Sequence, residues 1–160
     1  MSREPLDERS AASELSGRAK VLVVDDDRYI RELVRLHLSN AGHEVSSAED
    51  ALVAGRLIFR STPDVMIVDV EMPYMSGPEF VAAVRADTIL PFIPVVFMSV
   101  SEQLAAQSRV FGAEHLVKPF YKEQLLEAVG RCVERRRRER AWARALRAST
   151  AHLASLNAGA

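Results

Sequence analysis

Short apolar runs alternate along the chain with longer segments in which apolar residues recur every three or four positions. The runs are continuous and rich in β-branched residues, which is typical of strands buried on both faces of a parallel sheet. They comprise residues 21–24, 65–68, 95–98 and 115–117, with a weaker example at 44–47. Predicted helices lie at 28–41, 49–60, from 78, at 102–111 and from 121 onward. The alternation predicts an α/β domain, doubly wound around a five-stranded parallel sheet with five helices.

Helical periodicity also predicts which side chains face the core. In the first two helices Leu33 and Leu52 fall at apolar-face positions, together with Val34, Leu38 and Ile58. We expect all five side chains to be buried.

Charge divides the chain into unequal parts. Residues 20–130 carry 16 acidic and 10 basic residues, whereas residues 131–147 carry eight arginines and only two glutamates. Residues 1–19 show no sustained apolar period, which is typical of a flexible leader. The sequence therefore predicts a leader at 1–19, a folded domain at 20–132 and a basic helical extension at 133–160.

Composition excludes several classes of protein. At 48% hydrophobic and 27% charged residues, the chain has enough apolar material for a core and is not a disordered polymer. The single cysteine, Cys132, can form neither an internal disulfide nor a cysteine-based zinc site. No apolar run approaches the roughly 18 residues of a membrane span, and the polar start lacks a signal-peptide core. We expect a cytoplasmic protein.

Polar residues follow four of the predicted strands. The first ends at Asp25–Asp27, the third at Asp69, the fourth at Ser99 and the fifth at Lys118. The carboxyl ends of parallel strands meet at one edge of a sheet, where ligands bind. Clustered carboxylates repel one another and require a counterion, and oxygen ligands without His or Cys favour Mg²⁺. Asp69, on a buried strand, could then act as a nucleophile toward a phosphoryl group.

Taken together, these motifs resemble the receiver domain of two-component response regulators. The resemblance covers residues 20 to about 132 and rests on the stretches 21–27 (VLVVDDD), 63–77 (PDVMIVDVEMPYMSG), 95–99 (VVFMS) and 116–120 (LVKPF). It implies the flavodoxin-like receiver fold, with the last helix extended. It also implies that a histidine kinase or a histidine phosphotransfer protein donates a phosphoryl group in a phosphorelay. The surface formed by the fourth helix, fifth strand and fifth helix would then switch for partner or dimer interactions.

The resemblance assigns roles to individual residues. Asp69 becomes the phosphoacceptor, and Asp25 and Asp26 become the acidic pair that holds Mg²⁺. Ser99 takes the place of the switch hydroxyl, and Lys118 that of the lysine that pairs with the phosphoryl group.

Two further expectations follow from the same resemblance. The backbone carbonyl of Glu71 would be an additional metal ligand. The peptide bond before Pro119 is expected to be cis.

The chain departs from the family pattern near the predicted site. His115 stands where the family usually has the switch aromatic, Tyr or Phe, and would add polarity and pH dependence to the switch. Val100 stands where a small residue is common, and could narrow the approach to Asp69. Glu71 and Ser101 occupy positions that, in the family that the chain resembles, tune how fast water attacks the acyl phosphate.

The other acidic residues of these segments have simpler interpretations. Asp27 is better suited to a helix cap than to a metal ligand. Asp64 begins its strand, so it should lie at the opposite edge of the sheet. The alternative function is an Mg²⁺-dependent phosphohydrolase that resembles the haloacid-dehalogenase group. That group has an Asp-x-Asp motif near the start of the domain, whereas Asp69-Val70-Glu71 is central and lacks the second aspartate.

The arginine-rich extension has no Pro or Gly before Gly159, which favours a continued helix. One heptad-like stripe, apolar at four of its five positions, comprises Trp142, Leu146, Ser149, Leu153 and Leu156. The stripe favours a homodimer or a partner helix through residues 133–156, and the alternative is a solvated, frayed tail. Nucleic-acid binding is the least favoured interpretation. The chain is expected to be either a stand-alone receiver or the front of a longer protein.

Overall fold

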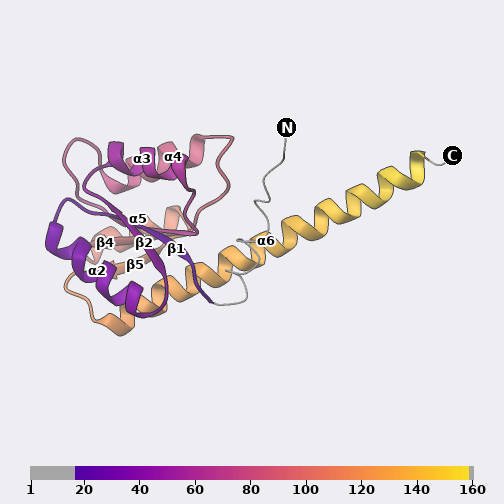
Figure 1. The fold of residues 1–160 in the computed structure, drawn as a ribbon. Helices are drawn as coiled ribbons and strands as arrows, with labels where there is room; N and C mark the ends of the chain where they lie inside the picture. Colours follow the sequence, from indigo (N-terminus) through magenta and orange to yellow (C-terminus); the bar gives the residue numbers. More distant parts are fainter. Residues whose placement is uncertain (1–16, 159–160) are drawn as a thin grey trace.

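A five-stranded, fully parallel sheet forms the centre of the molecule (Figure 1). The computed structural model describes residues 17–158, and the side chains of these except 105–107, 153 and 155–158. The strands are β1 (Lys20–Val24), β2 (Glu44–Ala48), β3 (Val65–Asp69), β4 (Val95–Ser99) and β5 (Glu114–Val117). Their order in the sheet, β2-β1-β3-β4-β5, reverses direction between β1 and β3. The doubly wound fold predicted from the sequence is confirmed.

Five helices cover the two faces of this sheet (Figure 1). They are α2 (Arg28–Asn40), α3 (Ala51–Arg60), α4 (Gly77–Ala86), α5 (Gln103–Val110) and α6 (Lys122–Ala158). Buried residues of α2 and the first part of α6 form one apolar core with the sheet. Those of α3 and α4 form the other, with Leu104 of α5 packed against it. The faces are separate because successive side chains of a strand point to opposite sides of the sheet.

Two local features fix the chain next to the carboxyl edge of the sheet. Asp27 caps α2, because its side chain accepts hydrogen bonds from the backbone N–H groups of Tyr29 and Ile30. Ser76 and Glu79 form a reciprocal capping box at the start of α4. Gly77 follows directly, at a position where a Cβ atom would collide with the backbone oxygen of Asp69. The loop after β3 can therefore lie close against the end of that strand.

Helix α6 continues without a break through the predicted boundary at residues 132 and 133. Its 37 residues correspond to about 56 Å of straight helix, and Figure 1 shows its second half projecting beyond the domain. Its apolar contact with the sheet ends at Val133, and the buried Arg136 lies one turn further on. Among residues 17–158, no helix combines the length and the apolar character needed to cross a membrane.

Two of the predicted core positions are wrong. Leu33 is 41% exposed and Leu52 is 66% exposed. The buried stripe of α3 runs through Ala54 and Ile58, four residues apart, and Leu52 lies two residues before it, on the far side of the helix. The prediction holds for Val34, Leu38 and Ile58.

Candidate functional site

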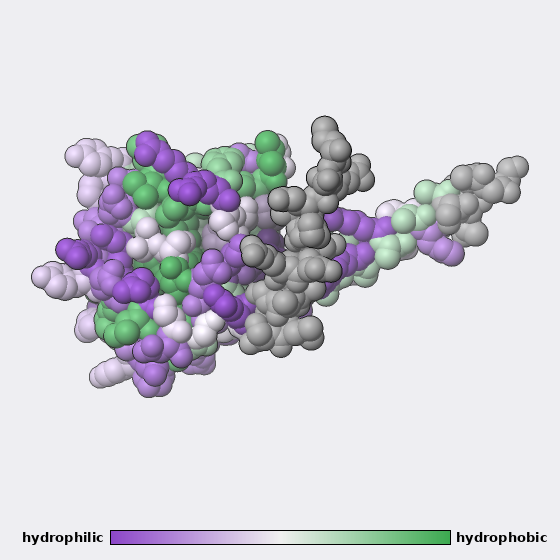
Figure 2. Space-filling view, in the orientation of Figure 1, coloured by the Kyte–Doolittle hydropathy of each residue, from purple (hydrophilic) through white to green (hydrophobic). Residues whose placement is uncertain are grey.

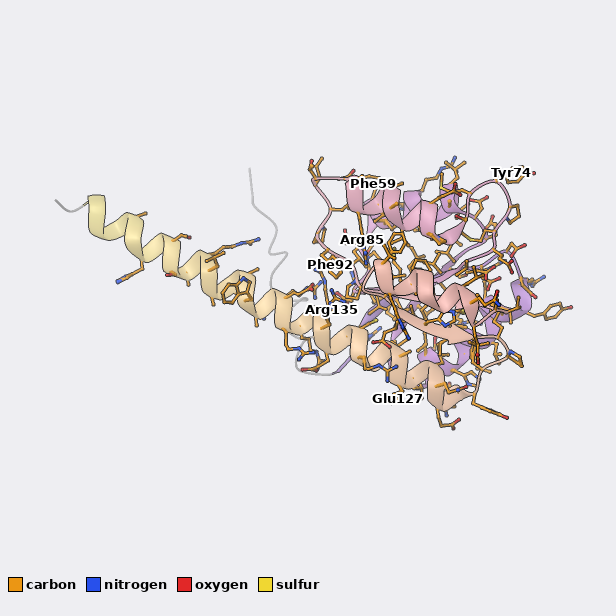
Figure 3. The ribbon with its side chains drawn as sticks, turned by 180° about the vertical axis from the view of Figure 1, so that it is seen from behind. Phe59, Tyr74, Arg85, Phe92, Glu127 and Arg135 are labelled. Atoms are coloured by element: carbon orange, nitrogen blue, oxygen red, sulfur yellow. The ribbon has the colours of Figure 1, made fainter. Side chains whose placement is uncertain are left out.

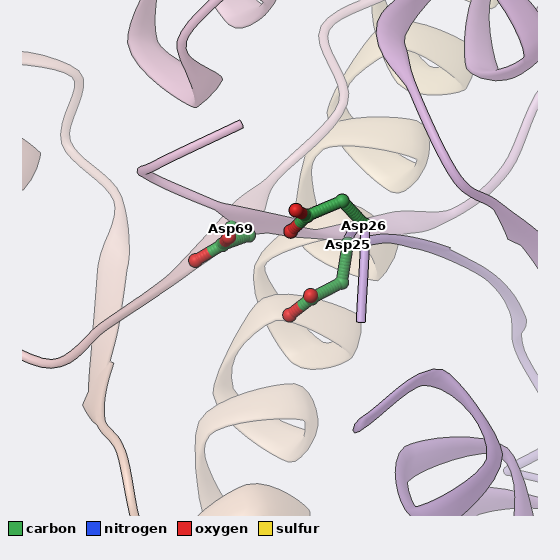
Figure 4. A group of neighbouring side chains, drawn as sticks. All are labelled: Asp25, Asp26 and Asp69. Atoms are coloured by element: carbon green, nitrogen blue, oxygen red, sulfur yellow. The ribbon is translucent and has the colours of Figure 1, made fainter. Parts of the chain in front are cut away.

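Three carboxylates meet at the carboxyl edge of the sheet (Figure 4). Asp25 and Asp26 follow β1, and Asp69 ends the neighbouring strand β3. Each contributes an oxygen atom that lies within 4.8 Å of the others. Asp25 is fully buried, Asp69 is buried with 5% of its surface exposed, and Asp26 is exposed. The cluster thus has one face toward solvent, where an ion or a phosphoryl group could enter.

Lys118, just after β5, supplies a positive charge to this cluster. Its Nζ lies 2.7 Å from Oδ2 of Asp25 and 3.1 Å from Oδ1 of Asp69. Its backbone N–H donates to the carbonyl oxygen of Ser99 at the end of β4. The next peptide bond, between Lys118 and Pro119, is cis. Lys118 therefore pairs with two of the three carboxylates, and the carboxylates of the cluster outnumber the lysine.

The electrostatics of the site follow from burial and from these neighbours. Burial, and then the negative charge of Asp25, raise the pKa of Asp69 to about 6, although Lys118 opposes the shift. For Lys118, burial would lower the pKa, but hydrogen bonds and charges from Asp25 and Asp69 outweigh it and raise the pKa above its usual range. Lys118 is therefore charged at neutral pH and can offset negative charge on Asp69 or on a group attached to it.

The donor set fits a hard divalent cation. Oxygen atoms are the preferred ligands of Mg²⁺, which accepts one or two carboxylates and keeps several waters. The exposed Asp26 leaves room for those waters, and the described cluster contains no histidine or cysteine that would favour a softer metal.

Residues outside the predicted set hold the acidic pair in place. The backbone N–H of Asp27 donates to Oδ1 of Asp25 at 2.9 Å. Arg31, in the first turn of α2, donates from Nη1 to the backbone carbonyls of Asp25 at 2.7 Å and Asp26 at 3.1 Å. Sequence reasoning missed Arg31. Its signal was a basic residue one turn into the helix that follows the three aspartates.

Ser99 and His115 are joined directly. The Ser99 hydroxyl donates its one proton to the carbonyl oxygen of Ser101 at 2.8 Å. His115 Nε2 lies 3.0 Å from the same hydroxyl oxygen, so it is Nε2–H that donates to Ser99. Burial lowers the pKa of His115, with Glu102 opposing, so the ring is neutral at pH 7. In this arrangement the Ser99 hydroxyl is engaged by groups other than Asp69.

The remaining predicted residues lie around this centre. Glu71 is exposed in the loop after β3, and Val100 is 66% exposed in the loop after β4. Asp64 is not part of the site. It lies at the opposite edge of the sheet, where its side chain accepts from the backbone N–H of Lys20 at 2.8 Å and pairs with Arg140 at 2.6 Å.

An acidic cluster and one lysine at the switch point of a doubly wound sheet define a class of small α/β domains built to bind a cation and a phosphoryl group. Residues 21–130 match the model of the response regulator receiver domain. The chain belongs to this family, and so to the proteins of two-component signalling.

Individual relatives support this assignment. Response regulator MprA of Mycobacterium sp. (strain KMS) is 39% identical over 110 residues, which are 67% of this chain and 47% of that protein. Protein PilG of Pseudomonas aeruginosa is 33% identical over 113 residues, 69% of this chain and 84% of that protein. The structure of the chemotaxis response regulator CheY4 of Vibrio cholerae superposes with a TM-score of 0.66 at 39% identity, covering 72% of this chain and 98% of that one. This chain spans about half the length of the MprA proteins it matches.

Proposed function

We propose that Asp69 is the phosphoacceptor of a histidine–aspartate phosphorelay, with a histidine kinase or a phosphotransfer protein as donor. The observation that carries the proposal is the position of Asp69. It is a buried carboxylate at the end of a central strand, with Lys118 Nζ at 3.1 Å and the oxygens of Asp25 and Asp26 beside it. Asp64, on the same segment, has none of these neighbours.

The proposed step is an in-line transfer. A carboxylate oxygen of Asp69 attacks the phosphorus of the donor phosphohistidine, a P–O bond forms, and the P–N bond breaks with its electron pair going to the imidazole. Lys118 pairs with the charge on the phosphoryl oxygens. Mg²⁺, held by Asp25, Asp26, Asp69 and the carbonyl of Glu71, would neutralise further charge on these oxygens.

The response to phosphorylation would begin at Ser99. To reach a phosphoryl oxygen on Asp69, its hydroxyl must leave the carbonyl of Ser101 and rearrange its bond with His115. His115 lies on β5, so the change would pass to the surface formed by α5, β5 and α6. This is the surface that we expect to present the signal to a partner.

Three nearby residues would set the lifetime of the phosphorylated form. Glu71 and Ser101, two residues after Asp69 and Ser99, would influence how fast water attacks the acyl phosphate, and Val100, next to Ser99, would narrow the approach to Asp69. The extension of α6 provides the second proposed interaction, through residues 133–156, with another copy of the chain or with a partner helix. Trp142 and Leu146 of its predicted stripe are exposed, and the side chains of Leu153 and Leu156 lie outside those that the structure describes.

Phosphorylation by a small donor tests the proposal. The chain is incubated with acetyl phosphate and Mg²⁺, and the intact protein is examined by mass spectrometry. We expect one added phosphoryl group on the wild type and none on Asp69→Asn. Asp64→Asn is the matched control, because it removes a carboxylate at the other end of the same strand, and it should be labelled like the wild type. Labelling of Asp69→Asn to the wild-type level would refute the assignment, and repeated turnover of a phosphate ester would favour the phosphohydrolase.

A further inference from the structure

An apolar groove of about 590 Å³ runs between α3 and α4, on the side of the molecule away from α6. Figure 2 shows green, hydrophobic surface among purple side chains over these two helices. Exposed apolar residues line the groove: Leu52 at 66%, Phe59 at 67% and Met75 at 38% of their surface. Isolated exposed apolar residues are ordinary, but residues gathered around one hollow mark an interaction site.

Helix α3 is apolar on two faces. One face, with Ala54 and Ile58, is buried against the sheet. The other, with Leu52 and Phe59, faces solvent at the groove, and the exposed Arg56 lies between them on the same face. A helix that is hydrophobic on both faces is typical of one covered on both, and nothing in the described part of this chain covers the second face.

The charged side chains among the lining residues of the groove are acidic. The charged residues that line it are Asp50 and Asp87, and no Lys or Arg is among them. Both cap neighbouring backbone N–H groups, which fixes their carboxylates at the surface. The occupant should therefore have an apolar centre flanked by basic side chains.

The second half of α6 has this chemistry. Trp142 is 72% exposed and Leu146 is 54% exposed, and they lie four residues apart on one face of the helix. The exposed Arg138 lies four residues before Trp142 on the same face, within a segment, 131–147, that has eight arginines and two glutamates.

This segment cannot reach the groove of its own chain. Helix α6 packs on α2 and on β3, β4 and β5, on the opposite face of the sheet from α3 and α4. Figure 3 shows Phe59 and Tyr74 at the groove on one side of the domain and Glu127 of α6 on the other. The helix then projects away from the domain. A contact between the two must therefore join two molecules.

We infer that the α3–α4 groove binds the Trp142–Leu146 face of α6 from a second copy of the chain. If each copy binds the other, the contact is reciprocal and closes into a dimer with two identical interfaces. The inference rests on the proposal that residues 133–156 associate, and it names the surface that they bind. It does not depend on phosphorylation of Asp69.

Sedimentation velocity of the full chain, over a range of concentrations, tests the inference. Leu52→Glu breaks the groove and Trp142→Ala removes the anchor. Both residues are exposed, so both variants should fold, which circular dichroism checks. We expect each to weaken dimerisation at least tenfold. The matched control is Leu36→Glu, because Leu36 is a 53% exposed leucine on α2, away from the groove, and this variant should dimerise like the wild type.

Mixing provides the sharper readout. A Leu52→Glu chain still has its Trp142, and a Trp142→Ala chain still has its groove, so their mixture can form one intact contact. Dimers should appear in the mixture at concentrations where neither variant dimerises alone. Added salt should weaken the wild-type dimer, because Asp and Arg charges are screened.

Two other outcomes distinguish a failure of the groove assignment from a failure of the proposed association of residues 133–156. If Trp142→Ala prevents dimerisation but Leu52→Glu does not, and added salt strengthens the dimer, the helices pair with each other and the groove is not their partner. If the wild type stays monomeric at every concentration, the association of residues 133–156 is refuted as well. Neither result bears on labelling at Asp69.

Discussion

The two edges of the sheet both concentrate charge, but they neutralise it in different ways. At the carboxyl edge three aspartates cluster, and one lysine pairs with two of them. At the amino edge, Arg85 of α4 and Arg135 of α6 lie beside Phe92 (Figure 3), and Arg85 also lies beside Phe111. The first edge needs a cation to balance its charge, whereas the second is built from groups that the protein itself supplies.

Aromatic rings and backbone carbonyls stabilise the arginines. The Arg85 guanidinium lies 4.9 Å from the ring centre of Phe92 and 5.6 Å from that of Phe111. The guanidinium of Arg135, on α6, lies 4.8 Å from the ring centre of Phe92. Arg85 also donates to the carbonyl oxygen of Phe111, and Arg136 donates to that of Phe92 at 2.7 Å. Burial, with Arg135 nearby, lowers the pKa of Arg85. These contacts hold α6 against the domain where its projecting half begins.

Carbonyls and rings are neutral, so they stabilise guanidinium groups without introducing another ionisable group, while Nε and Nη2 of Arg85 and Nε of Arg136 are buried without a hydrogen-bond partner. Carboxylates cannot neutralise one another in this way, because an ionised carboxylate only accepts hydrogen bonds and repels its neighbouring carboxylates. The amino edge thus balances its charge with rings, carbonyls and ion pairs inside the protein, whereas the carboxyl edge has more carboxylates than cations, and this excess favours the binding of a cation there.

The largest effect should come from removing the excess negative charge at the carboxyl edge. In Asp25→Asn/Asp26→Asn, two of the three carboxylates of the cluster become neutral, so we expect Mg²⁺ affinity to fall at least a hundredfold, measured by titration calorimetry. Asp27→Asn is the matched control from the same run of aspartates. Asn is an equally good N-cap, so this variant should fold and should bind Mg²⁺ like the wild type. If the double variant bound Mg²⁺ with unchanged affinity, the metal site would not lie at the carboxyl edge.

The sequence was sufficient for the sheet, the helix order and the residues that reach the carboxyl edge. Strands buried on both faces have a pattern of their own, and the ends of parallel strands converge whatever the details of packing. What it could not supply were contacts that depend on side-chain direction. Examples are the hydrogen bond between His115 and Ser99, the two carbonyls held by Arg31, and the outward position of Leu52. Helical spacing allowed a stripe through Leu52 as well as one through Ala54, and only packing against the sheet chose between them.

A moderate effect should appear in the pH dependence of stability without metal. The pKa of Asp69 is raised to about 6 from its usual 3.8, so between these values the folded state binds more protons than the unfolded state. The ionisation of Asp69 therefore destabilises the folded state as the pH rises through that window, and the loss of stability is complete above about pH 6.

Asp69→Asn resembles the protonated carboxyl at every pH. In EDTA its Tm should exceed that of the wild type most above pH 6, and the difference should shrink as the pH falls toward 4. Thermal melts of both proteins across that range measure it. A difference that does not change with pH would mean that Asp69 is not held in an unfavourable ionised form. The arginines of the amino edge contribute no such dependence, because they do not titrate in this range.

The smallest effects should come from Asp64, an acidic residue whose bonds tie the amino edge to α6. Asp64→Asn loses the charge that faces Arg140, but its amide oxygen can still accept from the backbone N–H of Lys20. We expect a cost of up to about 1 kcal/mol, typical of a pair that is partly open to solvent. Asp64→Ala also leaves the Lys20 N–H without its acceptor, which adds about 1–3 kcal/mol. Urea denaturation of the two variants separates the ion pair from the backbone hydrogen bond, and Mg²⁺ affinity should be unchanged in both. If Asp64→Asn were as unstable as Asp64→Ala, the ion pair with Arg140, and not the backbone hydrogen bond of Lys20, would stabilise this edge. Neutral hydrogen-bond partners would then not explain the stability of the amino edge at Asp64.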